Sequence, residues 1–240
     1  MRTATLLLVL ALAACADDMP AGCREDQPPG PTLLTSPSDS FFRTVAPDTF
    51  IARFETSRGN FFIQVVREWA PLGADRFYNL VRAGYYDDTR FFRVVPGFIA
   101  QWGIHGDSAV NAVWARACIR DDPIRRRNTR PAVSFAFGKP HTRTTQVFFN
   151  YGVNWRLDEA KFAPFGEVIA GTEILDSLYA EYGDTEPRGN GPDAVRAMRE
   201  GNRYLDAEFS SLDRIISARI AAERGYTARA RSRGSAGSEN

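Results

Sequence analysis

Residues 91–101, with the sequence FFRVVPGFIAQ, place one arginine among aromatic and aliphatic side chains. Residues two apart on a strand share a face, so Arg93 and Val95 can project together before a Pro-Gly pair turns the chain. A returning strand would then present Ile99 and Gln101 on one face. The segment predicts a permanently charged, planar set of hydrogen-bond donors beside an apolar wall. On spacing alone, a core hairpin whose arginine extends to solvent is an equal alternative.

Other common catalytic residue sets find little support. His105 and His141 are the only histidines, and neither lies in an HExxH or similar metal-binding frame. Ser108 and Ser134 lack the flanking glycines of a nucleophile elbow, which argues against a Ser-His-Asp hydrolase. The Asp-Asp pair that ends at Asp122 is typical of a solvated charged loop. The sequence also lacks a glycine-rich phosphate loop, so we expect neither a metal nor a cofactor.

The elements that must position the 91–101 segment are short strands with few helices. Residues 50–55 and 61–66 are rich in β-forming residues and flank a Ser-Arg-Gly-Asn turn, which predicts a hairpin. A helix is expected from Pro71 to a C-cap glycine at Gly84. We expect further strands at residues 89–94, 98–103, 132–136 and 146–150, a second helix with Thr172 as its N-cap, and a third helix starting near Pro192.

The third helix and a final strand are the last elements that the sequence predicts. Its apolar stripe is expected to face the core, and a last strand with alternating apolar residues should follow it. Many short strands with few helices favour a mainly β fold, either a barrel or a sandwich with helical lids. The residues of the stripe are Val195, Met198, Leu205 and Phe209, and those of the strand are Ile216, Ala218 and Ile220.

The two ends of the chain differ in composition from its centre. A short apolar run predicts a signal peptide over residues 1–14, which is too short to span a bilayer as a helix. The tetrad Leu-Ala-Ala-Cys ending at Cys15 resembles a bacterial lipoprotein box, in which the cysteine is acylated. The alternative is an ordinary cleavage site with that cysteine lost or left free. Residues 15–48 then form the lipid anchor and a flexible linker, residues 49–220 one domain, and residues 221–240 a disordered tail.

These ends predict an exported protein, tethered to a membrane of the bacterial cell envelope and facing the periplasm. In that oxidising compartment Cys23 and Cys118 could form a disulfide. The alternative is one linker thiol and one small buried residue. The formal net charge of +1 gives no reason to expect a nucleic-acid partner.

Three sequence blocks resemble the cyclophilin family of peptidyl-prolyl isomerases. Residues 91–101 carry its pattern F-x-R-V-V-P-G-F-x-x-Q, and residues 145–150, TQVFFN, resemble its S-Q-F-F-I-N strand. Leu157-Asp158 followed by FGEV at residues 165–168 resembles its L-D…F-G-x-V run. The match covers nearly all of residues 49–220. It implies a cyclophilin-like closed β-barrel of about eight antiparallel strands, capped by α-helices.

The resemblance implies an enzyme that rotates X-Pro peptide bonds without a cofactor. Amide resonance raises a barrier of about 18–20 kcal/mol, although cis and trans differ by only about 0.5–1 kcal/mol. A pocket that holds the proline ring helps, as does a donor that stabilises the prolyl nitrogen when its lone pair leaves conjugation. By resemblance, Arg93 would be that donor, and Gln101 would help hold Arg93 and the substrate. The implied substrate-binding residues are Val95, Phe98, Ile99, Ala136, Phe137, Gln146, Phe148, Leu157 and Phe162.

This chain departs from the family pattern at four positions. Phe92 stands where many cyclophilins have a histidine, and Phe137 where the peptide-binding strand reads Ala-Asn-Ala. Arg156 replaces a frequent tryptophan, although Trp155 is one position away, and Phe162 falls where a histidine usually closes the pocket. These changes are expected to affect substrate preference and rate more than the activity itself.

Two functions are compatible with this sequence. The first is a lipid-anchored isomerase that acts on proline-containing, unfolded or partly folded exported polypeptides. The second is a binding module, in which the same groove holds proline segments as a chaperone or scaffold but turns over poorly. Residues 183–209 form a longer insertion than a minimal cyclophilin carries. We expect this insertion to brace the barrel, and a partner surface is the alternative.

Overall fold

Eight strands form one sheet in the part of the chain that the computed structural model describes, residues 31–224. The strands are β1 (Thr49–Thr56), β2 (Gly59–Val66), β3 (Arg93–Val95), β4 (Ile99–Trp102), β5 (Ala132–Phe135), β6 (Val147–Asn150), β7 (Pro164–Ala170) and β8 (Ile215–Arg224). The helices are α1 (Pro31–Leu34), the 3-10 helix η1 (Ser40–Arg43), α2 (Pro71–Arg82), α3 (Ser108–Trp114), α4 (Trp155–Glu159), α5 (Thr172–Asp176), α6 (Ala194–Glu200) and α7 (Asn202–Glu208).

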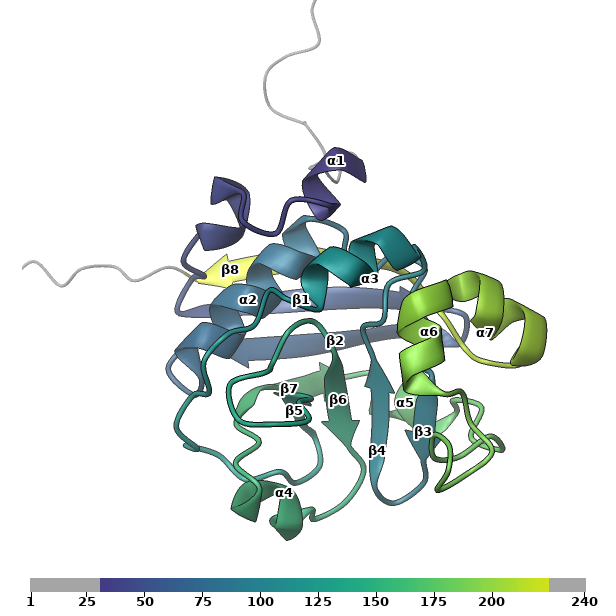
Figure 1. Ribbon diagram of the computed structural model, residues 1–240. Coiled ribbons are helices and arrows are strands. Elements are labelled where there is room, and N and C mark those ends of the chain that lie inside the picture. The colour runs from purple at the N-terminus through teal and green to yellow at the C-terminus, as the bar shows by residue number, and fades with distance from the viewer. Residues whose placement is uncertain (1–30, 225–240) are drawn as a thin grey trace, which may run out of the picture.

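The sheet has the order β3-β4-β6-β5-β7-β2-β1-β8, and every neighbouring pair is antiparallel. In Figure 1, β1 and β2 run across the molecule beneath α2, whereas β3, β4 and β6 run nearly at right angles to them. The mainly β fold of eight antiparallel strands is therefore confirmed.

The predicted closure of the barrel is wrong. The edge strands β3 and β8 do not pair as strands within residues 31–224, and the segments before them meet only at a single bridge between Arg90 and Arg214. The physical reason is register, because in this antiparallel bridge the chain after Arg90 runs opposite residues before Arg214, so β3 does not face β8. The result is an open barrel.

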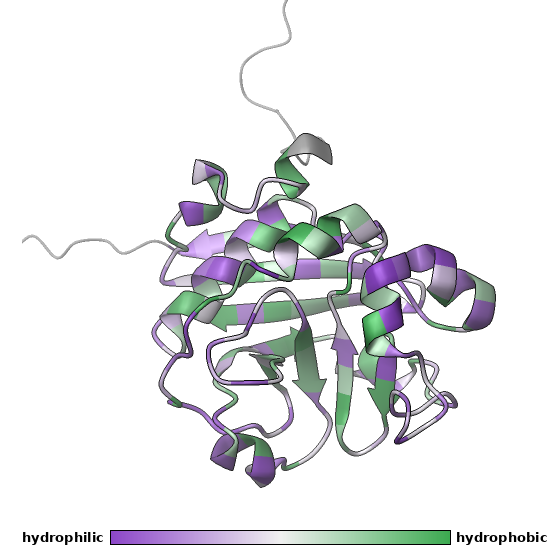
Figure 2. Cartoon of the chain, in the orientation of Figure 1, coloured by the Kyte–Doolittle hydropathy of each residue, from purple (hydrophilic) through white to green (hydrophobic). Residues whose placement is uncertain are grey.

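The β1–β2 hairpin and α2 form the centre of the core. Side chains of both strands alternate between buried and exposed, as the period of a half-buried strand requires. The Phe54 ring stacks on Phe61 at 4.9 Å and lies 6.0 Å from Phe77 of α2. Figure 2 shows β2 and β6 largely in hydrophobic green, whereas α4 is mostly in hydrophilic purple. The predicted hairpin and the predicted start of the helix at Pro71 are both confirmed.

The loop that contains Asp122 is anchored inside the protein rather than solvated. Its carboxylate accepts hydrogen bonds from the amides of Leu72 and Gly73 at the start of α2, and from Arg143 at 3.0 Å. The first amides of a helix lack partners within it, which makes its N-terminus favourable for a carboxylate. Because Arg143 is buried three residues before Gln146, this contact fixes the chain that leads into the site.

Residues before β1 pack onto the domain, which differs from the flexible linker predicted for residues 15–48. Trp114 donates from Nε1 to the carbonyl oxygen of Leu34 at 2.8 Å, and its ring meets Phe42 edge-on at 4.8 Å. Asn79 of α2 donates to the carbonyl oxygens of Phe42 and Thr44. The folded unit therefore begins before residue 49. At the other end, β8 continues to Arg224, beyond the boundary predicted at residue 220.

The insertion at residues 183–209 contains two short helices instead of the single third helix that was predicted. Gly201 separates them with φ of +61°, and a Cβ at this position would clash with the backbone carbonyl of Gly106. Leu205 is buried, as expected. Val195 was expected in the core but is 75% exposed, because Ala197 is the buried residue of α6 and a residue two positions earlier lies on nearly the opposite side of a helix.

A second hydrophobic cluster attaches this insertion to the sheet. Phe92, with 1% exposure, packs there between Ile104, which follows β4, and three buried residues of the insertion, Ala197, Tyr204 and Leu205. The cluster is separate from the main core. The prediction that the insertion braces the barrel is confirmed by this packing.

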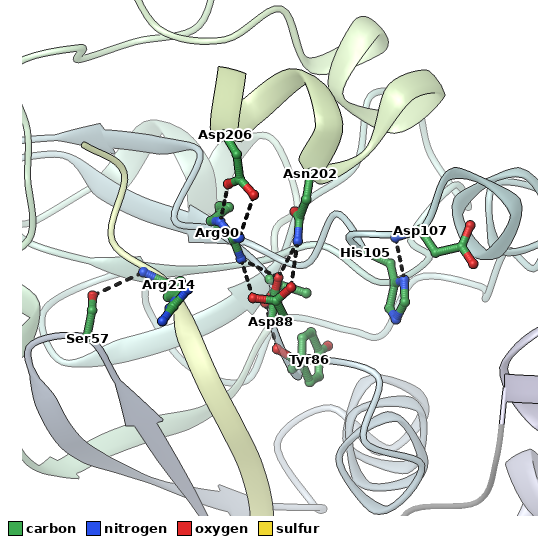
Figure 3. Close-up of polar contacts among 10 residues, drawn as sticks. Ser57, Tyr86, Asp88, Arg90, His105, Asp107, Asn202, Asp206 and Arg214 are labelled. Carbon is green, nitrogen blue, oxygen red and sulfur yellow. Dashed lines mark hydrogen bonds and ion pairs between the residues drawn. The ribbon is translucent and has the colours of Figure 1, made fainter. Parts of the chain in front are cut away.

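Polar contacts fix α7 beside the same cluster (Figure 3). Arg90 donates from Nε and Nη2 to the two carboxylate oxygens of Asp206, at 2.9 and 3.0 Å, and from Nη1 to Asp88. Asn202 donates to the backbone and side-chain oxygens of Asp88. His105, nearby, accepts from the amide of Asp107, and burial is the main cause that lowers its pKa. This histidine therefore helps to order the turn that leads into α3.

The inward face of β8 also differs from the predicted alternation. Ile215 and Ala218 are buried, whereas Ile216, expected to face inward, is 47% exposed. The register between β1 and β8 shifts between Glu55 and Thr56. A bulge of this kind moves the following side chains to the opposite face.

No helix among residues 31–224 is long and apolar enough to cross a membrane. Within the same range, no group of three or more His, Cys, Asp or Glu residues is placed to hold a metal ion. Cys118 is exposed, while Cys15 and Cys23 lie outside the described residues. The signal peptide, the lipid anchor and the disulfide therefore stay predictions.

Replacement of Phe92 tests the role of the second cluster. Phe92→Ala removes a fully buried ring, and such changes lower the free energy of unfolding by about 3–5 kcal/mol. Amides of α6 and α7 should lose more protection from hydrogen exchange than those of β1 and β2. Val195→Ala in the same insertion is the control and should change stability by less than about 0.5 kcal/mol. Equal exchange rates in wild type and Phe92→Ala would contradict the assignment.

Candidate active site

The register of three strands places Arg93, Gln101 and Phe148 side by side. Arg93 on β3 lies opposite Gln101 on β4, and Gln101 lies opposite Phe148 on β6. Directly opposed residues of antiparallel strands point to the same face of the sheet. The turn between β3 and β4 is closed by a hydrogen bond from the amide of Phe98 to the carbonyl of Val95, 3.0 Å long. The hairpin predicted from the Pro-Gly pair is thus confirmed.

A chain of side-chain hydrogen bonds starts at the guanidinium of Arg93. Its Nη1 donates to Oε1 of Gln101 at 3.1 Å, and Nε2 of Gln101 donates to Oε1 of Gln146 at 2.9 Å. Nε2 of Gln146 lies 3.6 Å from the sulfur of Met198 on α6. The structure therefore brings together the three polar residues that the sequence selected, and it adds a residue of the insertion.

Sequence analysis missed the strongest partner of Arg93. Asp184, from the loop that precedes α6, accepts hydrogen bonds from Nε at 2.7 Å and from Nη2 at 3.2 Å. The two side chains are 15% and 20% exposed. The partners are 91 residues apart in the chain, and Asp184 belongs to none of the three sequence blocks. A run of turn-forming residues, GDTEPRGNG, was the one sequence signal of an ordered loop there.

Aromatic rings form the wall beside this polar chain. Phe148 and Ile99 are buried, and the ring of Phe162 meets that of Phe148 edge-on at 5.6 Å. Phe137 stacks on Phe162 with ring centroids 4.1 Å apart. The guanidinium of Arg93 lies 5.5 Å from the centre of the Phe98 ring. Two of the three phenylalanines at family departures, Phe137 and Phe162, therefore belong to one continuous apolar wall.

Two cavities adjoin this wall. One, of about 320 Å³, is lined by Gln101, Gln146, Ala136 and Phe137, with Met198 contributed by the insertion. The other, of about 240 Å³, lies between Phe98 and the segment around α4 and includes Leu157 and the exposed Trp155. Val95 lies opposite Ile99 on the hairpin and is not among the residues that line either cavity.

Phe92 is next to Arg93 in the sequence, but its side chain does not contribute to the groove. Its side chain points into the second cluster and not into the groove. Phe92 directly precedes β3, whose first residue is its neighbour Arg93. The groove therefore differs from the family pattern at Phe137, Phe162 and Arg156, whose guanidinium lies over the Trp155 ring.

Comparison with known protein families identifies one family that matches this sequence. A family described as "Cyclophilin type peptidyl-prolyl cis-trans isomerase/CLD" matches residues 51–200. The chain belongs to this family. The enzyme class predicted from the sequence, a cyclophilin-type peptidyl-prolyl cis-trans isomerase, is therefore confirmed.

Individual members of the family show the extent of the similarity. The chain is 35% identical over 135 residues to "Peptidyl-prolyl cis-trans isomerase-like 3" of Rhizopus delemar, covering 51% of this chain and 78% of that protein. It is 29% identical over 150 residues to "Peptidyl-prolyl cis-trans isomerase A" of Dickeya dadantii, covering 60% and 77%. A cyclophilin-type isomerase of Cryptosporidium parvum has the same fold, with a TM-score of 0.55 and 20% identity over 73% of this chain and 99% of that one.

Proposed function

We propose that Arg93 accelerates rotation about X-Pro bonds by stabilising the twisted amide over an apolar proline pocket. The observation that carries the proposal is the position of the guanidinium, held by Gln101 at the edge of the aromatic wall. Phe98, Ile99, Phe148 and Leu157 would hold the proline ring, and Gln146 would help position the peptide. The carbonyl that precedes proline would then swing while the ring stays in place.

The chemistry requires no nucleophile, because no covalent bond is made or broken. Rotation removes the prolyl nitrogen from conjugation, and its lone pair becomes available as a hydrogen-bond acceptor. A donor next to this nitrogen binds the twisted amide more strongly than the planar one, and this difference lowers the barrier. Burial beside aromatic rings strengthens such a hydrogen bond relative to water.

The hydrogen bonds of Arg93 leave donors free for this role. A guanidinium has five N–H groups. Asp184 takes one from Nε and one from Nη2, and Gln101 takes one from Nη1. One N–H on Nη1 and one on Nη2 remain. They supply the two adjacent donors needed for the prolyl nitrogen and the neighbouring backbone carbonyl.

The aromatic wall also supports the rival function. Phe137 and Phe162, stacked at 4.1 Å, form an apolar surface that can bind a peptide whether or not its X-Pro bond rotates faster. A chaperone or scaffold would need only this surface, whereas an isomerase needs the Arg93 donors as well. Measuring binding and exchange separately distinguishes the two functions.

Arg93→Ala removes the proposed donor and leaves the aromatic wall in place. Exchange between cis and trans forms of an Ala-Pro peptide, measured by NMR, should slow by about 10²–10³-fold, the usual effect of losing a preorganised donor. Peptide binding should change much less. Arg53→Ala, at a half-exposed arginine on β1, is the matched control and should keep the wild-type rate. If wild type and Arg93→Ala both bind the peptide and neither accelerates exchange, the binding function replaces the proposal.

The proposed setting is the periplasmic side of a bacterial membrane, with exported polypeptides as substrates. It is supported by the apolar N-terminal run and the Leu-Ala-Ala-Cys tetrad ending at Cys15. Residues 33–46 pack on α2 and α3, so a lipid on Cys15 would tether the folded domain to the membrane. Unfolded chains entering the periplasm offer X-Pro bonds that isomerise slowly without help.

Acylation of Cys15 can be tested directly. Cells that express the full chain are labelled with a fatty-acid analogue, and the protein is recovered from membrane and soluble fractions. Wild type should carry the label and sediment with membranes, whereas Cys15→Ser should do neither. Cys118→Ser controls for modification at an exposed cysteine and should behave as wild type. Unlabelled wild type would contradict the lipid anchor but leave the isomerase proposal intact.

A further inference from the structure

The insertion contributes a carboxylate to the guanidinium on which the proposed function depends. Asp184 and Arg93 meet side-on, with Nε and Nη2 each donating to a separate carboxylate oxygen. This two-point contact fixes the plane of the guanidinium as well as its position. Gln101 holds the remaining nitrogen, Nη1, from the neighbouring strand. Every nitrogen of the guanidinium therefore has a protein partner before a substrate binds.

The pair is more sheltered from solvent than most ion pairs among residues 31–224. Arg93 and Asp184 are 15% and 20% exposed, compared with 39% and 45% for Arg130 and Asp176, which make a similar contact on the surface. Exposed pairs contribute little because water and salt screen them. Partial burial makes the loss of one partner more serious, since the other charge is left without compensation.

The loop around Asp184 is shaped to hold this residue. The amide of Gly191 donates to the carbonyl oxygen of Asp184 at 2.9 Å, and the amide of Thr185 donates to the carboxylate at 2.7 Å. A Cβ at Gly189 or Gly191 would lie too close to the backbone of Asp184. The two glycines therefore allow the chain to close tightly around the aspartate. A loop with only a covering role would not require this approach.

The charge state of Asp184 suits a permanent contact. Burial alone would raise the pKa of the carboxyl, but the hydrogen bonds and charge of Arg93, the Thr185 amide and the charge of Arg188 outweigh it, so the pKa is lowered. Arg93 faces the carboxylate from β3 and Arg188 from its own loop. A lowered pKa keeps the carboxylate ionised at pH values where an ordinary aspartate is already protonated, and the contact is lost only as pH falls through the lowered value.

We propose that Asp184 is a positioning residue of the active site, which orients the Arg93 guanidinium so that one Nη1 and one Nη2 donor face the prolyl amide. The inference rests on the proposed role of Arg93. It gives the insertion a second task beside bracing, because the loop before α6 completes the catalytic arginine. Without Asp184, Gln101 alone would hold one nitrogen, and the long arginine side chain would sample other rotamers. Rotation of the guanidinium away from the amide lowers the rate without removing the peptide-binding wall.

The test measures kcat and KM for Ala-Pro peptide exchange in three aspartate variants and Arg93→Ala. Asp184→Asn should lower kcat roughly 10-fold, the rate equivalent of losing one charged hydrogen bond, with little change in KM. Asp184→Glu, which can restore the two-point contact, should recover most of the rate. Asp206→Asn is the matched control, because Asp206 makes the same Nε and Nη2 contact with Arg90 in the same insertion. It should leave kcat at the wild-type value.

The NMR signal of the Arg93 Nε–H group gives a second readout that overall stability does not move. It should be protected from solvent exchange in wild type and Asp206→Asn, and exposed in Asp184→Asn. Wild-type kcat in Asp184→Asn, together with loss of activity in Arg93→Ala, would overturn this inference and leave the proposed function standing. An equal loss in Asp206→Asn, or a faster Asp184→Asn, would also overturn it. Full activity of Arg93→Ala would instead contradict the proposed function.

Discussion

The partly buried guanidinium of Arg93 must be held in one orientation, and both the sheet and the insertion contribute to this. Removing an arginine from water is unfavourable unless its donors find partners and its charge finds a counter-charge. Gln101 comes from the adjacent strand, because the register of the β3–β4 hairpin pairs it with Arg93. Asp184 comes from a segment far along the chain, and it reaches Arg93 only because the insertion is attached to the same edge of the sheet. Fold and site are therefore connected through one ion pair.

The attachment of the insertion gives a physical meaning to a departure from the family pattern. Phe92 replaces the histidine of many cyclophilins, and its ring is buried among residues of α6 and α7. Adjacent residues of the chain thus have separate tasks: Phe92, just before β3, anchors the insertion, and Arg93, at the start of β3, receives its carboxylate. The Arg90–Asp206 contact reinforces the anchor nearby. The apolar residue before the arginine is therefore needed because the larger insertion packs against it.

Local patterns predicted much of the fold and most of the residues that meet at the site. Alternation identified the β1–β2 hairpin, Pro71 marked the start of α2, and motif residues from three strands meet because antiparallel register aligns them. Features that depend on distant contacts were not predictable in this way. Asp184 lies 91 residues from its partner, and the exposure of Ile216 follows from a bulge in pairing with β1. The helix break at Gly201 is required by the close backbone of Gly106, and the short α3 and α4 were too brief for a periodic signal.

The central claim is that geometry, and not charge alone, makes Arg93 effective. Lysine keeps the positive charge but has neither a planar fork nor the side-on contact that Asp184 makes. The most direct test is therefore NMR exchange of an Ala-Pro peptide with Arg93→Lys, alongside measured peptide binding. The account predicts that Arg93→Lys binds the peptide but accelerates exchange no better than Arg93→Ala. A wild-type exchange rate in Arg93→Lys would contradict it.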